Sequence, residues 1–330
     1  MGSHIAVAPG SINIDLILKT DTRKGPKTFK GHYRESQGGK GSNQAVAARL
    51  ASGRQREVYL VGCVGQDGWG DQAIAKLADR GVNTEHVRAT DQAPTGVVME
   101  YLYGDGEVTI GLGLGANLEV MIADIEGARP AIEEATVLLC QVETPLPALQ
   151  RAVELARSGG AVVCLDPSVV PEPGPDLEML LKGVFPHVHL VAPNRSEALA
   201  LTGVSVIDDA SALDAARILL ERVEVAIVTR GPDGALIARN GEHHFARGYR
   251  VAAIDGGAAG DTFRGTFAAA LAEAMDRRSH GFEDLAFTDL AGALDLANAA
   301  AALCVTRTGA CPSIPERREI DAFMRSHRPG

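Results

Sequence analysis

The residues best suited to chemistry lie in the segment Asp255-Gly-Gly-Ala-Ala-Gly-Asp261, which runs directly into an apolar helical pattern. Small residues before a helix let backbone N–H groups approach a ligand closely, and the first helical turn leaves such groups unpaired at the positive end of the dipole. The segment therefore predicts an anion site suited to a phosphoryl group in transfer. Asp261 could accept a hydroxyl proton there while the amides stabilise the developing charge. On this segment alone, the simpler interpretation is that Asp261 is only the N-cap of the helix, a position that Asp favours.

The segment Gly38-Gly-Lys-Gly-Ser-Asn43 also precedes a helical pattern. It is not a Walker A loop, because Lys40 is followed by Gly and the spacing fails. Its glycines would allow close approach of the backbone, and Lys40 would add one ammonium group. This combination is suited to binding a polyol, although Asn43 could instead be only a helix N-cap.

Asn13 and Asp15 form a third feature, at the end of the first apolar strand pattern. Side chains two residues apart in an extended chain project to the same side. A carboxylate beside an amide matches vicinal hydroxyl groups, because the carboxylate can accept two hydrogen bonds. The alternative is an Asx turn that ends the strand.

These three features need a fold that brings distant segments together. Short apolar runs predict strands at 5–8, 58–61, 137–141, 162–166, 189–192 and 225–229. Helical patterns fall at about 43–51, 70–80, 146–158, 208–222, 262–275, 283–304 and 315–326. Strands that alternate with helices indicate an α/β fold with a doubly wound, mostly parallel sheet covered on both faces. Ligands in such folds bind outside the carboxyl ends of the strands, where we expect the chemistry to lie.

Two segments, 12–35 and 96–113, do not follow this alternation. Both contain short alternating strand patterns, and Gly104-Asp105-Gly106 supplies a turn in the second. We expect them to form a small sheet that leaves the main domain and can cover a cleft. A second hairpin is predicted at 235–247, where Asn240–Gly241 is a strong two-residue turn signal.

The composition excludes several classes of protein. A chain of 330 residues with 45% apolar residues fits one large core with a small appendage. A net charge of −10 without a dense Lys/Arg run argues against nucleic acid as a partner. Five cysteines without paired spacing favour a reducing compartment and argue against zinc. No leader pattern begins the chain, and the Ala-rich run 291–305 is too short and polar to span a bilayer, so we expect a cytoplasmic protein without a membrane partner.

Ordered motifs along nearly the whole chain resemble the ribokinase branch of the phosphofructokinase B-type (ribokinase-like) sugar kinase family. The matching segments are Asn13/Asp15, GGKGSNQA at 38–45, GCVGQDGWG at 62–70, PTG at 94–96, GAN at 115–117, QVETP at 141–145, PN at 193–194, TRGPDG at 229–234, GAAGDTF at 257–263 and VTRTGACPSIP at 305–315. The resemblance implies a Rossmann-like α/β catalytic domain formed by 5–11, 36–95 and 114–328. It also implies a β-sheet lid formed by 12–35 and 96–113.

The resemblance assigns roles to residues around the three features. Asp261 matches the catalytic base, which also contacts the sugar, and the amides of Ala258, Ala259 and Gly260 match the anion hole. Positions that bind the sugar hydroxyls are matched by Asn13, Asp15, Gly39, Lys40, Asn43 and Glu143.

The resemblance further implies an ATP site and two cation sites. Nucleotide-binding positions are matched by Asn194, Thr229, Gly231, Gly234, Gly260 and Asn298. Glu197 belongs to an Asn-x-x-Glu motif that is associated with the placement of Mg²⁺ and phosphate. A monovalent-cation site, which activating potassium occupies in this family, is matched by Asp255, Gly257, Cys304, Arg307, Gly309 and Ser313.

The implied activity is phosphorylation of D-ribose by ATP to give D-ribose 5-phosphate and ADP, in a homodimer joined through the lids. The chain also departs from the family pattern, because Gly256–Gly257 replaces a frequent Thr-Thr and Arg264 stands where a small or amide residue is common. Another sugar, a nucleoside or inositol therefore stays an alternative acceptor. A ligand-binding module without catalysis is a third hypothesis, against which the intact Asp261 argues.

Overall fold

An eight-stranded sheet forms the centre of the computed structural model, which describes residues 4–53, 56–278 and 281–330. Six strands run parallel, in the spatial order β12 (Val225–Thr229), β11 (Leu190–Val191), β10 (Val162–Asp166), β9 (Val137–Gln141), β1 (Ile5–Val7) and β4 (Val58–Leu60). An antiparallel hairpin of β13 (Gly234–Arg239) and β14 (Glu242–Arg247) extends the β12 edge. The predicted doubly wound, mostly parallel sheet is confirmed.

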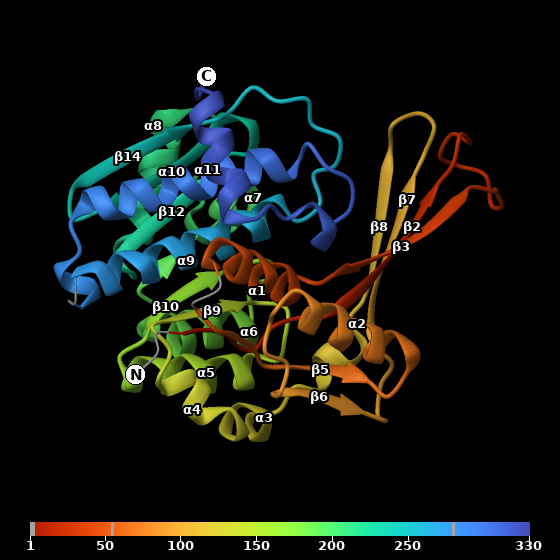
Figure 1. The fold of residues 1–330 in the computed structure, drawn as a ribbon, viewed down its shortest axis with the longest axis horizontal. Coiled ribbons are helices and arrows are strands. Elements are labelled where there is room, and N and C mark those ends of the chain that lie inside the picture. Colours follow the sequence, from red (N-terminus) through yellow and green to blue (C-terminus); the bar gives the residue numbers. More distant parts are fainter. Residues whose placement is uncertain (1–3, 54–55, 279–280) are drawn as a thin grey trace.

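Helices cover both faces of this sheet (Figure 1). One core contains residues of α1 (Lys40–Ala51), α2 (Gly68–Asp79), α9 (Ala259–Arg278), α10 (Phe287–Cys304) and α11 (Arg317–Ser326). The other contains residues of α3 (Ile122–Gly127), α4 (Arg129–Glu133), α5 (Leu146–Gly159), α7 (Arg195–Thr202) and α8 (Asp209–Leu219). Strand β1 supplies both cores, because Ile5 and Val7 point to the first and Ala6 to the second. This two-sided burial explains why the strands are almost entirely apolar.

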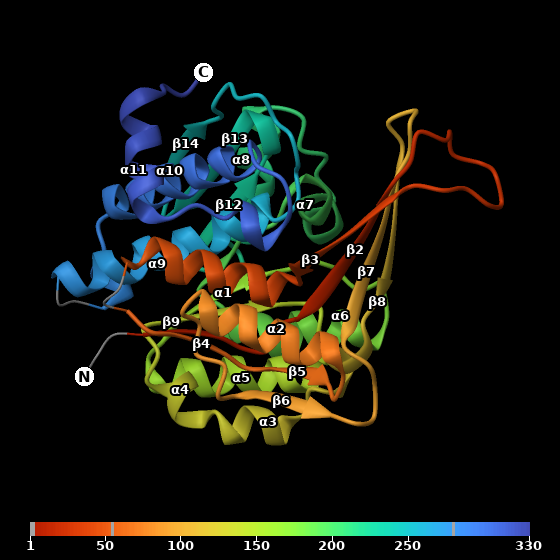
Figure 2. The same ribbon diagram turned by 45° about the vertical axis from the view of Figure 1, so that its right-hand side comes forward.

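A smaller four-stranded sheet protrudes from the main body (Figure 2). Its order is β3 (His32–Gly38), β2 (Asn13–Lys19), β7 (Gly96–Leu102) and β8 (Val108–Gly113), with the β2–β7 pair parallel and the other pairs antiparallel. The strand patterns predicted in 12–35 and 96–113 are thus present, and β3 runs on to Gly38. A separate two-stranded sheet of β5 (Gly62–Gly65) and β6 (Val87–Thr90) was not predicted.

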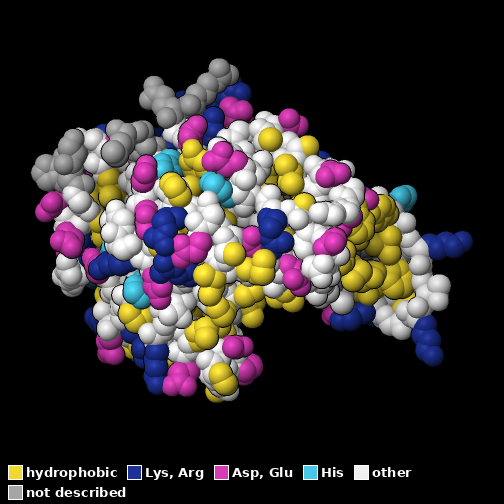
Figure 3. All heavy atoms as spheres, turned by 90° about the horizontal axis from the view of Figure 1, so that it is seen from below, with side chains coloured by type: hydrophobic (Ala, Val, Ile, Leu, Met, Phe, Trp, Pro, Cys, Tyr) yellow, Lys and Arg dark blue, Asp and Glu magenta, His cyan; other side chains and the backbone are white. Residues whose placement is uncertain are grey.

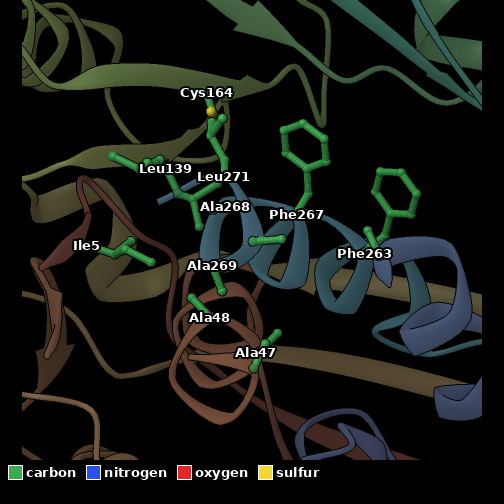
Figure 4. Packing of buried hydrophobic residues seen from close by; sticks show 14 of the residues in the cluster. Ile5, Ala47, Ala48, Leu139, Cys164, Phe263, Phe267, Ala268, Ala269 and Leu271 are labelled. Atoms are coloured by element: carbon green, nitrogen blue, oxygen red, sulfur yellow. The ribbon is translucent and has the colours of Figure 1, made fainter. Parts of the chain in front are cut away.

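Helices α1 and α9 pack closely against each other on one face of the main sheet. Figure 4 shows Ala269 of α9 pointing toward Ala48 of α1. A Cβ atom at Gly265 of α9 would lie 2.4 Å from the carbonyl oxygen of Gln44 and 2.6 Å from Cβ of Ala47. Glycine at this position therefore allows the two helix N-termini to meet.

Three predicted helix starts are wrong: α10 begins at Phe287 rather than at 283, and the other two errors affect the site. Helix α1 begins at Lys40 with Gly39 as its N-cap, rather than at Asn43. Helix α9 begins at Ala259, so Asp261 lies in its first turn rather than at its cap. The predicted hairpin turn is confirmed, since Asn240 and Gly241 have φ values of 50° and 84°. Within the described ranges, every helix is too short or too polar to cross a bilayer.

Candidate functional site

The carboxylate of Asp261 is held where the first turns of α1 and α9 meet. Asn43 Nδ2 donates to Asp261 Oδ2 at 3.0 Å, and Gln44 Nε2 lies 3.1 Å from Asp261 Oδ1. Burial raises the pKa of Asp261, and the charge of Asp166 raises it further. The nearby Lys40 and Arg264 oppose this shift but do not cancel it. Neither Asn43 nor Asp261 is a helix cap, so the simpler interpretation of both residues is contradicted.

A buried amide network behind Asp261 was not predicted. Gln44 Nε2 also donates to Asp166 Oδ2 at 2.8 Å, and Gln141 Nε2 donates to Gln44 Oε1 at 2.8 Å. Because each of these side chains is nearly inaccessible to solvent, their amide orientations are strongly constrained. The only sequence signal for Gln44 was its place directly after Asn43. Asn43 Oδ1 is buried and has no hydrogen-bond partner among the described residues.

Lys40 and Glu143 face each other across the same site. Lys40 Nζ lies 4.0 Å from Glu143 Oε1, and Ser11 Oγ donates to Glu143 Oε2 at 2.7 Å. Burial alone would lower the pKa of Lys40, but the carboxylates of Asp261, Asp166 and Glu143 outweigh it and raise the pKa. The lysine therefore stays charged beside three acidic groups.

Asn13 and Asp15 lie inside strand β2, so an Asx turn that ends a strand is excluded. Asn13 Oδ1 accepts a hydrogen bond of 2.8 Å from Asn117 Nδ2, and Asn117 Oδ1 accepts from the backbone of Ile12. Asp15 packs against Gly38, where a Cβ atom would lie 2.2 Å from Oδ1 of Asp15. Burial raises the pKa of Asp15 to about 7, with further contributions from Glu100, Asp261 and Asp255. Asn117, in the GAN motif, was not assigned a role from the sequence.

The turn before α9 contains one residue in a left-handed conformation. Ala258 has a φ of 60°, a left-handed conformation that a residue with a Cβ atom rarely adopts. Asp255 Oδ1 accepts from Gly257 N and its Oδ2 from Gly309 N, both at 2.9 Å. Burial alone would raise the pKa of Asp255, but these bonds and the Arg34 guanidinium, 3.3 Å from Oδ2, lower it. The small sheet thus contacts the turn directly through Arg34.

Glu197 and Asn194 form a capping box at the start of α7. Asn194 Oδ1 accepts from Glu197 N at 3.0 Å, and Glu197 Oε2 accepts from Asn194 N at 2.9 Å. Glu197 Oε2 also lies 3.4 Å from Arg264 Nη2. Burial raises the pKa of Glu197, with Arg264 opposing the shift. The same strand edge therefore holds Glu197, Arg264 and Asp261.

The remaining predicted nucleotide residues lie farther along this edge. Thr229 Oγ1 is 3.4 Å from the carbonyl oxygen of Pro193, and Gly231 and Gly234 both have positive φ values. Asn298 Nδ2 donates to the carbonyl oxygen of Arg247 at 2.7 Å. A surface hollow of about 640 Å³ beside this loop includes Arg230, Pro232 and the segment 247–250 in its lining.

The residues predicted to hold a monovalent cation form a linked cluster. Cys304 Sγ is 3.0 Å from Ser313 Oγ and 3.8 Å from the carbonyl oxygen of Gly257, and Asp255 binds Gly257 and Gly309 as described above. The side chain of Arg307 turns away to pair with Glu319 at 2.7 Å, which leaves only its carbonyl for such a site. Within 4–53, 56–278 and 281–330, no group of three or more His, Cys, Asp or Glu side chains could hold a metal ion.

Comparisons with known proteins agree with this geometry. A family model described as pfkB family carbohydrate kinase matches residues 5–317. The ribokinase of Haemophilus influenzae is 33% identical over 319 residues, which cover 96% of this chain and 96% of that protein. The structure of the Giardia lamblia ribokinase matches with a TM-score of 0.88 at 25% identity and covers 99% of both chains. The Arabidopsis thaliana ribokinase complexed with ribose and ATP matches with a TM-score of 0.78 at 26% identity and covers 98% of both chains.

Proposed function

The chain belongs to the pfkB family of carbohydrate kinases, and we propose that it is an ATP-dependent ribokinase that forms D-ribose 5-phosphate and ADP from D-ribose and ATP. The ribokinase relatives support this acceptor, since they match over nearly the whole chain. The single observation that carries the proposal is the position of Asp261. Its carboxylate touches Asn43 of the glycine-rich segment and stands at the N-terminus of α9.

In the proposed reaction, Asp261 accepts the proton of the attacking sugar hydroxyl. Because burial raises the pKa of Asp261, it binds a proton more readily than an ordinary carboxylate does. The amides of Ala258, Ala259 and Gly260 would stabilise charge on the transferring phosphoryl group, as helix N-termini do for anions. Phosphoryl transfer depends on such alignment and charge stabilisation more than on covalent chemistry by the protein.

We place the sugar between β2 and the start of α1. The buried Asn43 Oδ1 supports this placement, since a buried acceptor without a partner is costly unless a ligand hydroxyl donates to it. Asp15 and Glu143 would accept further hydroxyl hydrogens, Lys40 would donate, and Asn13 and the Gly39 backbone would complete the site. Asn117 holds Asn13 in position through its amide.

ATP would lie along the carboxyl edge from Asn194 to Asn298, with Thr229, Gly231 and Gly234 around the nucleoside and Gly260 at the phosphates. Positive φ at Gly231 and Gly234 leaves their backbone open for close approach. Mg²⁺ would bind mainly to the phosphates of ATP, because this ion usually keeps several of its water ligands and binds few protein carboxylates. Glu197 would reach it through water, since its carboxylate already accepts from Asn194 and Arg264.

The donor set around Asp255 fits a potassium ion, because carboxylate, carbonyl and hydroxyl oxygens are hard ligands. Asp255 and Ser313 would contribute side chains, and Gly257, Cys304, Arg307 and Gly309 would contribute carbonyl groups. The ion would supply a fixed positive charge beside the anion-binding turn. Arg34, which already pairs with Asp255, would share this carboxylate with it.

We assign residues 12–35 and 96–113 to a lid on the catalytic domain formed by 5–11, 36–95 and 114–328. Figure 3 shows hydrophobic side chains gathered on the protruding sheet, where Val108, Ile110 and Leu112 of β8 are exposed. An exposed apolar sheet face needs a partner, and a second copy of the chain supplies one. The proposed enzyme is a cytoplasmic homodimer, a location supported by five free, buried cysteines.

The test is a coupled assay of ADP release with D-ribose, other sugars, nucleosides and inositol as acceptors. We expect ribose to give the highest kcat/KM, and Asp261→Asn to lower kcat by about 10²- to 10⁴-fold while ribose still binds. Asp214→Asn on the exposed surface of α8 is the matched control and should behave as wild type.

A clear preference for nucleosides or inositol would replace ribose as the acceptor and keep the kinase. Sugar binding without turnover of any acceptor would favour the binding-module hypothesis. Normal turnover by Asp261→Asn would remove the assigned base.

A further inference from the structure

Arg264 carries a buried positive charge one helical turn after Asp261 and has no role in the site as described so far. Its side chain belongs to α9 and is 7% exposed. Burying a guanidinium is costly unless its donors are satisfied, so each of its contacts is informative.

One edge of the guanidinium is tied to the strand ends. Its Nε and Nη2 donate to the carbonyl oxygen of Ala192 at 3.2 and 2.7 Å. Nη2 also lies 3.1 Å from Asp166 Oδ1, which ends β10, and 3.4 Å from Glu197 Oε2. Ala192 directly follows β11, so three elements hold the group in one orientation.

The other amino group, Nη1, points toward the anion-binding turn. Nη1 lies 2.8 Å from the point where a Cβ atom of Gly260 would be. No other described residue accepts a hydrogen bond from Nη1. A rigidly held cation thus presents an unused N–H donor beside Gly260, in the first turn of α9.

We propose that Arg264 is a further catalytic residue, whose Nη1 donates a hydrogen bond to the phosphoryl group as it passes from ATP to the acceptor hydroxyl. This role rests on the proposed kinase function. The guanidinium cannot lose its proton in proteins and is bound on its far edge, so it needs no reorganisation during the reaction. A fixed arginine of this kind stabilises the charge spread over the phosphoryl oxygens in the transition state.

The competing explanation is a structural counter-ion for Asp166 and Glu197. That role needs only Nη2, whereas the proposed role needs Nη1. A structural loss would lower the free energy of unfolding and affect all ligands alike. A catalytic loss would affect kcat and the binding of a transition-state mimic, and would leave ribose binding unchanged.

The experiment compares Arg264→Gln and Arg264→Lys with Arg239→Gln as matched control. Arg239 is equally buried, and it donates to the carbonyl oxygens of Leu285, Phe282 and Glu283 away from the site. We expect Arg264→Gln to lower kcat by about 10²- to 10³-fold, as removal of one oxyanion donor does, with the KM for ribose changed by less than about threefold. Arg264→Lys keeps the charge and should still lose about tenfold or more, because one ammonium cannot bind Ala192 and the phosphoryl group together. Arg239→Gln should lower only the melting temperature.

Two further measurements separate a catalytic role of Arg264 from a structural one. In the presence of ribose, the affinity for ADP with aluminium fluoride should fall about a hundredfold in Arg264→Gln, while the affinity for ADP alone stays within about threefold. Guanidinium ion at low, non-denaturing concentration should restore part of kcat to Arg264→Ala.

Wild-type kcat in Arg264→Gln, or an equal loss of affinity for ribose, ADP and the mimic, would overturn the role of Arg264 and leave the kinase proposal intact. If Arg264→Gln does not fold, wild-type kcat in Arg264→Lys would overturn it in the same way. A wild-type protein without turnover of any acceptor would remove the proposed function, and the catalytic role of Arg264 with it.

Discussion

The two buried carboxylates Asp261 and Asp15 differ in their surroundings, and the difference suits them to different roles in the site. Asp261 accepts hydrogen bonds from Asn43 and Gln44, whereas Asp15 lies beside Glu100 and other acidic groups with little compensation. Burial raises the pKa of both residues. For a general base such a shift is useful, because it brings the proton affinity closer to the working pH. For a residue that must accept hydroxyl hydrogens, the shift makes binding sensitive to pH.

Asp15 should therefore make sugar binding depend on pH near neutrality. The pKa of Asp15 is about 7 in the folded protein against 3.8 ordinarily, so the ionised fraction rises about tenfold between pH 6 and pH 8. We expect ribose to bind about tenfold more tightly at pH 8 than at pH 6, as measured by isothermal titration calorimetry. Asp15→Asn should bind weakly, with an affinity that does not change over this range.

The raised pKa of Asp15 should increase ribose affinity as the pH rises, but it should decrease the stability of the folded protein over the same change. Between about pH 4 and pH 7 the folded protein keeps a proton on Asp15 that the unfolded chain has released, so stability falls as the pH rises through this window. The melting temperature of Asp15→Asn should therefore exceed that of wild type at pH 8 by more than at pH 5.

A wild-type ribose affinity that is flat from pH 6 to pH 8 would contradict the assignment of Asp15.

At the scale of elements, the contact of α1 with α9 sets the distance between the sugar-binding segment and the base. Asn43 and Gln44 come from α1 and Asp261 comes from α9, and the hydrogen bonds among them are 3.0 and 3.1 Å long. Gly265 and the alanines around it allow the close approach. A larger side chain at the contact would have to separate the two helices.

Gly265→Ala should both destabilise the protein and slow the reaction. Its Cβ atom would lie 2.4 Å from the carbonyl oxygen of Gln44, and overpacking of this kind costs about 1–3 kcal/mol. We expect kcat to fall as well, because the helices carry the two halves of the site. Thermal unfolding and the ADP-release assay measure the two effects.

Gly292→Ala is the matched control for this change. Gly292 lies in α10, and nothing is within 4 Å of the position of its Cβ atom. Alanine there should raise the stability by up to about 1 kcal/mol and leave kcat unchanged. Equal behaviour of the two variants would show that the α1–α9 contact does not limit the site.

At the scale of the whole molecule, the two sheets have different roles. The main sheet is buried on both faces, whereas the small sheet exposes apolar side chains on β8. Register places Leu112 opposite Val98 and Val98 beside Asp15, so these side chains share one face of the sheet. The face that carries a proposed sugar ligand therefore continues outward as an apolar surface.

Ile110→Lys combined with Leu112→Lys should convert the proposed dimer to a monomer. These residues are 58% and 57% exposed in the single chain, and two charges on each copy would have to be buried on association. We expect light scattering after size-exclusion chromatography to show the monomer, and the KM for ribose to rise as the lid loses support. Ile218→Lys on α8 should leave the dimer intact. A wild-type monomer at micromolar concentration would contradict the homodimer.

The sequence by itself determined the layered α/β fold, the parallel strands of the main sheet and the Asn240–Gly241 turn, because these follow from local patterns, whereas it did not reveal β5 and β6. Alternating apolar runs and helical periods mark the elements, and Asn240–Gly241 marks a hairpin through its own backbone preferences. The helices that begin at Lys40 and Ala259 were predicted to begin three residues later, because the glycine-rich and Ala-rich segments at their starts contain no polar cap residue to mark them.

Only the tertiary structure decided which side chains touch. Gln44 and Asp261 are 217 positions apart, and Arg264 meets a carbonyl group 72 positions away. Such contacts depend on how α1 packs on α9 and on where the strands end, and no local pattern encodes these distances. Three features therefore became visible only in the folded chain, because each depends on packing between segments that no single motif contains. They are the amide network of Gln44 and Gln141, the hydrogen bond from Asn117 to Asn13, and the Nη1 donor of Arg264, which has no acceptor among the described residues.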